Sequence, residues 1–234
     1  MYFEIEKNVF EYFPNMRVVT VLAKGFDGTV HEEKINEYLD DGWKTAAACS
    51  TEFGNPQSHP NIKPWGERMK NIGVSRKKYP SSVEALVRRA GKNENPVRIN
   101  LIVDFYNAIS LKYLVPAGAY DIEQLNDNIK LRFSKEGDTF QALDSDEVID
   151  IPEGEISYAD GSIIITRHFI WKQSKHMLLT PQSKDILFVS EILGELPENT
   201  AFDVGQGISR GLRECFEIDS KVKILDVNDN KVEL

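Results

Sequence analysis

The chain has 234 residues, of which 41% are hydrophobic and 28% are charged, so it can bury one sizeable core and wholesale disorder is excluded. Its formal net charge of −9 at pH 7 excludes a uniformly basic coat for nucleic acid, although not a local basic patch. The two cysteines, Cys49 and Cys215, exclude a disulfide framework and a paired-cysteine zinc motif. We expect a soluble, cytoplasmic protein, because no apolar run approaches the ~18–20 residues of a membrane span and the first residues lack a signal-peptide pattern.

The first half of the chain is predicted to be mainly helical. Residues 17–23 (RVVTVLA) are rich in β-branched side chains and predict an early strand. Apolar residues at helical spacing predict helices over residues 31–49, 64–69 and 99–114, and Pro116 ends the last of them. Ser81 and Glu84 fit the N-cap and N3 positions of a capping box, so another helix is expected to begin there.

After Pro116 the period of the apolar residues changes from about 3.6 to about 2, which predicts strands. Two hairpins are expected, one joining 130–133 to 139–143 across the turn KEGD and one joining 156–159 to 163–167 across Asp160-Gly161. Residues 185–191 predict a buried strand, 200–216 a closing helix and 221–226 a last short strand. The predicted fold class is therefore α+β, a mixed β-sheet core packed with helices.

Charge is segregated along the chain. Residues 63–98 hold ten basic and three acidic side chains, whereas residues 136–160 hold nine acidic side chains and no Lys or Arg. Two interpretations stay open: both segments are ordinary solvated faces, or an acidic protein keeps one cationic face for a polyanion.

Two segments contain polar side chains that are typical of a ligand pocket. Residues 167–176 (RHFIWKQSKH) mix cations, aromatic rings and hydrogen-bonding groups directly after a strand, with a solvated β-turn as the alternative. In the predicted helix over 99–114, Asp104, Asn107 and Ser110 share one stripe, and small residues follow Pro116, where a ligand can approach the backbone. The alternative for Asn107 and Ser110 is that they satisfy buried backbone groups.

Two other features of the sequence are weaker evidence for a functional site. Residues 207–211 (GISRG) match the G-x-S-x-G pattern of α/β-hydrolases, but the preceding residues look helical and no histidine follows His176. Small residues on a packing face of a helix are the better interpretation. The four histidines lack the spacing of a zinc site, so neither a metal nor another cofactor is expected.

An ordered series of motifs resembles a known family. The series consists of Pro96 with 98–121 (RINLIVDFYNAISLKYLVPAGAYD), then 130–133, 153–161, 166–176 and 185–191. In this order they resemble the B3/B4 domain, the editing domain of the beta subunit of phenylalanyl-tRNA synthetase, which also exists as freestanding proteins. The resemblance covers roughly residues 80–195. It implies a B3/B4-like domain over 80–234 and an N-terminal α/β extension over 1–79 packed on the core, together one compact unit.

The resemblance implies an aminoacyl-tRNA deacylase that acts in trans on the ester of a mischarged tRNA. Binding alone separates similar amino acids poorly, and a second, hydrolytic site solves that problem. Because the ester is already activated, a positioned water and hydrogen bonds to the developing oxyanion can suffice without a Ser-His-Asp triad. The alternative is a non-catalytic module that binds tRNA or a free amino acid.

The sequence departs from the synthetase pattern at one important place. The synthetase domain has a histidine in its P-x-H-A-[FY]-D motif, where this chain has Gly118. The specificity glutamate of the synthetase falls near Val189 here, and Glu191 lies two residues further on, on the same strand face. Tyrosine editing is therefore not carried over. If the protein hydrolyses its ligand, His176 or Glu191 is expected to replace the missing histidine.

We expect three groups of site residues, and the 3′ aminoacyl end of a tRNA as partner, with neither DNA nor a membrane involved. The catalytic group is Asn107, Gly118, Gln173, His176 and Glu191. The substrate-binding group is Ser110, Ala117, Tyr120, Arg167, Trp171 and Ser174. The tRNA-binding group is Arg68, Lys70, Arg76, Lys77, Lys78, Arg88 and Arg89.

Overall fold

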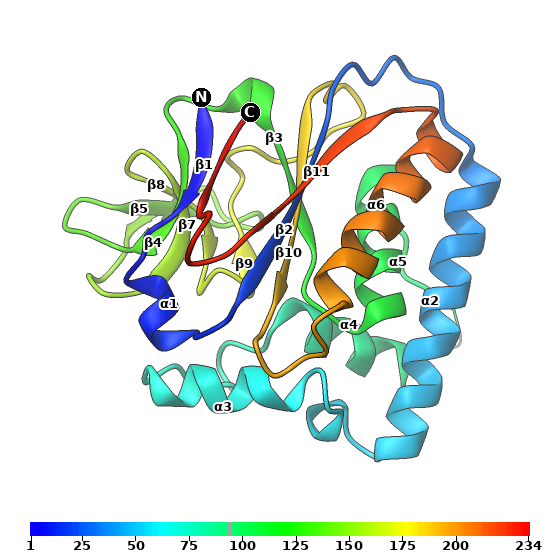
Figure 1. Ribbon diagram of the computed structural model, residues 1–234, viewed down its shortest axis with the longest axis horizontal. Coiled ribbons are helices and arrows are strands. Elements are labelled where there is room, and N and C mark those ends of the chain that lie inside the picture. Colours follow the sequence, from blue (N-terminus) through cyan, green and yellow to red (C-terminus); the bar gives the residue numbers. More distant parts are fainter. Residues whose placement is uncertain (93–94) are drawn as a thin grey trace.

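The computed structural model of the protein describes residues 1–92 and 95–234, in which two β-sheets lie side by side and helices cover the outer face of the smaller sheet (Figure 1). The larger sheet contains both parallel and antiparallel pairs, since β1 runs parallel to β4 and β5 parallel to β8. Its strand order is β12 (Lys231–Glu233), β1 (Tyr2–Ile5), β4 (Ile129–Phe133), β7 (Ile156–Asp160), β8 (Ile163–Arg167), β5 (Thr139–Gln141) and β6 (Val148–Asp150), with β9 (Lys172–Gln173) also paired to β8.

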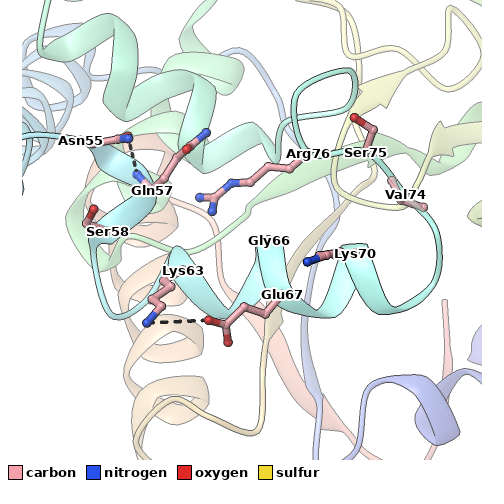
Figure 2. A pocket seen from close by; sticks show the side chains of 10 residues that line it. All are labelled: Asn55, Gln57, Ser58, Lys63, Gly66, Glu67, Lys70, Val74, Ser75 and Arg76. Atoms are coloured by element: carbon pink, nitrogen blue, oxygen red, sulfur yellow. Dashed lines mark hydrogen bonds and ion pairs between the residues drawn. The ribbon is translucent and has the colours of Figure 1, made fainter.

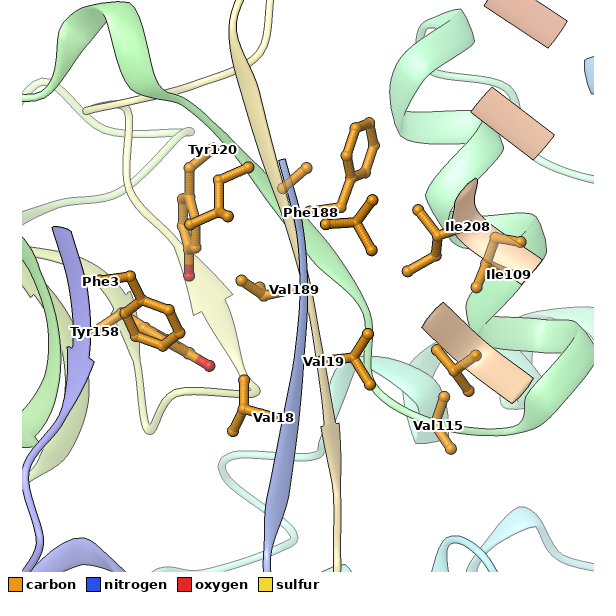
Figure 3. Close-up of a cluster of buried hydrophobic side chains, with 14 of the residues drawn as sticks. Phe3, Val18, Val19, Ile109, Val115, Tyr120, Tyr158, Phe188, Val189 and Ile208 are labelled. Carbon is orange, nitrogen blue, oxygen red and sulfur yellow. The ribbon is translucent and has the colours of Figure 1, made fainter. Parts of the chain in front are cut away.

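The smaller sheet is antiparallel and is covered on both faces. Its order is β11 (Ser220–Leu225), β2 (Arg17–Ala23), β10 (Ile186–Ile192) and β3 (Gly118–Asp121). Because side chains alternate along a strand, Val18 and Val189 face the larger sheet and meet Tyr158, whereas Val19 and Phe188 face the helices (Figure 3). All five are buried. Side chains of β10 therefore pack against the larger sheet on one face and against the helices on the other.

Two helices pack on the smaller sheet and a long helix packs behind them (Figure 1). Close approach depends on small residues: a Cβ atom at Gly42 of the long helix would lie 2.9 Å from the carbonyl oxygen of Ala108. The described helices are α1 (Val9–Tyr12), α2 (Glu32–Phe53), η1 (Pro56–Ser58), α3 (Lys63–Asn71), α4 (Ser82–Ala90), α5 (Leu101–Tyr113), η2 (Ile122–Gln124) and α6 (Thr200–Phe216). None of these helices is long and apolar enough to cross a membrane.

The G-x-S-x-G segment lies within α6, which agrees with the packing interpretation. A Cβ atom at Gly207 would collide with the Tyr113 ring, and one at Gly211 with the Phe105 ring. The hydroxyl of Ser209 lies 3.0 Å from that of Ser220 on β11. These glycines therefore bring α6 against α5 and leave Ser209 without the strand that a nucleophile elbow requires.

Most predicted elements are confirmed, but one hairpin is wrong. The strand 17–23 and the helix 200–216 agree with β2 and α6, and the 156–167 hairpin forms as β7–β8. The strands β4 and β5, predicted to pair across KEGD, are separated in the sheet by β7 and β8. The reason is that Asp138 turns inward to form a buried ion pair with Arg132 (2.6 Å) and to accept from the Lys135 amide (2.8 Å), so this segment forms a loop.

Residues from the first third of the chain contribute to both sheets. The strand β1 lies between β12 and β4, and β2 lies between β11 and β10. The helix α2 packs against α5 and α4. The division at residue 79 stays a prediction about which part folds by itself.

Candidate functional site

A pocket of about 310 Å³ lies where α4, α5, β3, β10 and the β8–β9 hairpin meet. We call it the α4–α5 pocket. It is lined by residues from segments far apart in the sequence, which include Asn107 of α5 and Gln173 of β9. Of the predicted catalytic and substrate-binding residues, its lining contains Asn107, Ala117, Gly118, Tyr120, Trp171, Gln173 and Glu191, and Arg89 of the predicted tRNA-binding group joins them.

Two buried serines fix the turn that carries Ala117 and Gly118 into the pocket wall. The helix α5 ends at Tyr113, and the next residue, Leu114, has the left-handed φ of 53°. The Ser110 hydroxyl donates to the Val115 carbonyl oxygen (2.6 Å), and the Ser190 hydroxyl of β10 donates to the Pro116 carbonyl oxygen (2.6 Å). Ser110 thus supports the pocket from behind and is absent from its lining.

Glu191 is the buried acid of the pocket. Its side chain comes from β10, is only 3% exposed, and accepts a hydrogen bond of 2.6 Å from the Tyr158 hydroxyl of β7. Burial raises the pKa of the Glu191 carboxyl to about 7, although the Tyr158 hydroxyl favours the charged form. A carboxyl with such a pKa can exchange a proton near neutral pH.

Two amides present hydrogen-bonding groups to the pocket. The Gln173 Nε2 donates to the Ala119 carbonyl oxygen (3.0 Å), which fixes the side chain of this half-buried residue. Among the described residues, Gln173 Oε1 and the Asn107 amide have no hydrogen-bond partner, while Asn107 is 9% exposed. These groups can bind the polar atoms of a small ligand without breaking a bond within the protein.

Trp171 is held over the pocket by a strained turn and a cation. His168 and Phe169 have φ values of 45° and 40°, a left-handed conformation that is unusual outside glycine. The Arg167 guanidinium lies 5.5 Å from the Trp171 ring and forms an ion pair of 2.6 Å with Glu155, whose side chain is 6% exposed. Arg167 is not among the lining residues, so the structure places it as a support of Trp171.

Comparisons with known proteins agree with this architecture. The family model described as the B3/4 domain matches residues 65–198, which is more than half of the chain. The chain belongs to the B3/4 domain family. No curated protein matches it significantly. Among solved structures, an N-terminal fragment of the phenylalanyl-tRNA synthetase beta subunit from Pyrococcus horikoshii is similar with a TM-score of 0.50 and 9% identity. The match covers 93% of this chain and 49% of the fragment, so the chain spans about half the length of that fragment and shares its fold.

Within this B3/4 domain, Gly118 leaves open space. A Cβ atom at this position would meet no other atom within 4 Å, and Gly118 does not have a left-handed φ. A larger side chain therefore fits here without backbone strain and would extend into the pocket. The glycine at position 118 enlarges the cavity and is not required by the backbone.

Two other predicted site residues of this B3/4 domain lie outside the pocket lining. His176 Nε2 lies 2.7 Å from the Asp160 carboxylate at the end of β7. The buried Ser174 hydroxyl accepts from the His176 amide (3.0 Å). Both residues stabilise the segment after β9, whereas Glu191 lines the pocket.

The predicted tRNA-binding cations divide into two groups. Arg68 pairs with Glu195 (2.5 Å), and Arg76 and Arg88 both pair with the buried Glu84 (2.6 Å each). Among the described residues, the other four cations form no ion pair and are exposed at the surface: Lys70, Lys77, Lys78 and Arg89.

The sequence did not identify several residues that complete the pocket. Tyr106 lies one position before Asn107, and both residues line the pocket. Tyr106 could have been predicted from the sequence, because it follows Val103, another lining residue, by three positions on the helix. Tyr158 donates to Glu191, and Ser190 donates to the Pro116 carbonyl oxygen. Both lie on strands whose position beside the pocket could not be predicted from the sequence. Within residues 1–92 and 95–234, no three His, Cys, Asp or Glu side chains are grouped to hold a metal ion.

Proposed function

We propose that the protein is a trans-acting aminoacyl-tRNA deacylase, which hydrolyses the ester between a wrongly attached amino acid and the 3′ end of a tRNA. The observation that carries the proposal is that Asn107, Gly118, Gln173 and Glu191, from four separate segments, line one pocket of about 310 Å³. This volume lies within the range of small-molecule sites. Membership of the B3/4 domain family and the fold shared with a synthetase fragment support an aminoacyl ester as the ligand.

The proposed reaction starts with the attack of a water oxygen on the carbonyl carbon of the ester. The Glu191 carboxylate accepts the proton that the water loses, and the Asn107 amide donates to the oxyanion that forms. The bond between the carbonyl carbon and the ribose oxygen then breaks, and Glu191 returns the proton to that oxygen. The products are the free amino acid and a tRNA with its hydroxyl restored. Gln173 Oε1 is available to accept from the amino group of the substrate.

A second candidate is a non-catalytic module that binds an aminoacyl-tRNA or a free amino acid. Two observations favour it: position 118 carries no side chain where the synthetase pattern has a histidine, and Glu191 is only 3% exposed. The pocket would then recognise its ligand with the same amides without turnover.

The deciding experiment measures the deacylation of a panel of mischarged tRNAs by the purified protein, at concentrations that saturate binding. The first proposal predicts that at least one ester is hydrolysed faster than in buffer alone. Gly118→Leu should abolish the acceleration by filling the pocket without backbone strain, and Asn107→Ala should lower it. Ser209→Ala is the matched control, because Ser209 lies on α6 and does not line the pocket.

The possible outcomes separate the candidates. An acceleration that Gly118→Leu removes and Ser209→Ala retains supports the deacylase. The absence of acceleration across the panel, with tRNA binding weakened by Asn107→Ala and Gly118→Leu, excludes the deacylase and supports the binding module. An acceleration that only Ser209→Ala removes would contradict both.

A further inference from the structure

A second and larger cavity lies on the other side of α4, between α3, η1 and the segment that precedes α4. Its volume is about 600 Å³. We call it the α3 cleft. Its lining contains three cations and one acid, together with the hydroxyl and amide side chains of Ser58, Ser75, Asn55 and Gln57. The three cations are Lys63, Lys70 and Arg76, and the acid is Glu67 (Figure 2).

The charge of the α3 cleft is only partly neutralised by the protein. Glu67 lies 3.7 Å from Lys63, at one edge of the cleft (Figure 2). Arg76 pairs with Glu84, but that buried carboxylate also binds Arg88 and accepts from Gln57, so one acid serves two guanidinium groups. Lys70 has no acidic partner among the described residues. The cleft therefore keeps an excess of positive charge.

Arg76 has donors left over for a ligand. Its Nε donates to Glu84 (2.6 Å), whereas Nη2 is buried without an acceptor, and Nη1 also donates to no acceptor among the described residues. A Cβ atom at Gly66 of α3 would collide with Nη1, so the glycine makes room for the guanidinium over the helix (Figure 2). A guanidinium that is held in place with unsatisfied donors is suited to an oxyanion with several acceptors.

We propose that the α3 cleft is a phosphate-binding site, in which Arg76 and Lys70 hold the phosphate oxygens and the polar side chains at the rim complete the contacts. The phosphate can belong to an RNA backbone or to a free phosphate or mononucleotide. The proposal goes beyond deacylation and does not depend on chemistry in the α4–α5 pocket. The two cavities lie against different faces of α4, because Ser82 and Leu86 line the α4–α5 pocket whereas Glu84 binds the arginine of the α3 cleft.

The first test is a titration of the full chain with inorganic phosphate, followed by amide NMR at constant ionic strength with chloride as the compensating anion. The amides of Gly66, Lys70 and Arg76 should shift and saturate. Lys70→Gln and Gly66→Ala should each weaken binding about tenfold. Gly66→Ala keeps every charge and moves only the guanidinium, and alanine is a better helix former than glycine.

The matched control is Lys221→Gln, which removes the same charge from an exposed residue on β11, outside the cleft lining, and should leave the phosphate affinity unchanged. Shifts that do not saturate, or an equal effect of Lys70→Gln and Lys221→Gln, would overturn the proposal in favour of general electrostatic attraction. The amides of α6 report whether each variant keeps its fold. If Gly66→Ala does not, Lys70→Gln against Lys221→Gln decides the question.

The second test identifies the source of the phosphate. For an RNA backbone, Lys70→Gln should reduce the slope of log affinity for tRNA against log salt by about 0.7–0.9, which corresponds to one lost phosphate contact, and Lys221→Gln should reduce it less. For a free ligand, adenosine monophosphate should bind with an affinity that depends on Lys70, while the tRNA slope stays unchanged. Deacylation is not measured in either arm, so failure here is distinguishable from failure of the proposed function.

Discussion

At the scale of single residues, the chemistry of the α4–α5 pocket depends on Glu191 and its partner Tyr158. The sequence could indicate Glu191, because two-residue spacing puts it on the same strand face as Val189, and both residues line the pocket. It could not indicate Tyr158, because this hydroxyl comes from β7 of the other sheet. His176 looked equally suitable in sequence, but the Asp160 carboxylate binds it outside the pocket.

The first prediction concerns the pH dependence of deacylation. If Glu191 acts as the base, the rate should rise with pH and level off above its pKa of about 7. Glu191→Gln should lower the rate by about 10²–10⁴-fold and remove this rise. Tyr158→Phe should move the midpoint to higher pH, because it removes a hydrogen bond that favours the carboxylate. Initial rates corrected for spontaneous hydrolysis check this, and an unchanged midpoint in Tyr158→Phe would exclude Glu191 as the titrating base.

The second prediction concerns stability. The pKa of Glu191 in the folded protein is about 7 against an ordinary value of 4.5, so the folded state keeps a proton that the unfolded chain has already released. The contribution of Glu191 to the free energy of unfolding should therefore be greatest below pH 4.5, should fall as pH rises from 4.5 to 7, and should be smaller by about 3 kcal/mol above pH 7. Denaturant unfolding at several pH values measures this fall, and Glu191→Gln should reduce it. The exposed Glu136→Gln is the control and should leave it unchanged.

At the scale of elements, the turn between α5 and β3 shows why local patterns give only part of a site. Pro116 correctly predicts the end of the helix, and the capping serine of α4 is confirmed by the contact between the Glu84 amide and the Ser81 hydroxyl (3.4 Å). Ser110 was predicted to bind substrate, but its hydroxyl reaches the Val115 carbonyl oxygen instead. That bond requires the left-handed Leu114, which sequence spacing does not reveal.

The third prediction follows from this turn. Ser110→Ala and Ser190→Ala should each lower the free energy of unfolding by about 1–2 kcal/mol, because each leaves a buried carbonyl oxygen without its donor. The two effects should not add, since both hydroxyls hold the same turn. A double-mutant cycle in denaturant unfolding measures the coupling. Full additivity, with no change at the Gly118 amide resonance, would show that the serines do not position the pocket wall.

At the scale of the whole molecule, the fold class could be predicted from the sequence, but the order of the strands in the sheets could not. Hydrophobic periodicity is local, whereas β4 and β5 are separated in the sheet by two strands that come later in the sequence. The distribution of charge in space also could not be predicted without the tertiary structure. Part of the acidic segment is paired, as in the contact of Lys172 with Asp144 (2.9 Å), so segregation in sequence is not full segregation in space.

The fourth prediction tests the division at residue 79. A fragment of residues 80–234 lacks β1, β2 and α2, so it loses strands from inside both sheets and the helix behind α5. We expect this fragment to show no cooperative unfolding transition in denaturant, unlike the full chain. A cooperative transition would identify 80–234 as an independent folding unit. By the same reasoning, we do not expect the family-model range 65–198 to fold by itself, because it omits β2 and α6.

The helix α4 separates the α4–α5 pocket from the α3 cleft. Ser82, Leu86 and Arg89 line the pocket, whereas Glu84 binds the arginine of the cleft. A substitution on one face of α4 can change the ligand preference of one cavity and leave the other cavity intact. An inserted residue would instead rotate all later residues of the helix by about 100°, and would damage both cavities at once. Variation in this segment is therefore expected to proceed by exchange of side chains at constant helix length.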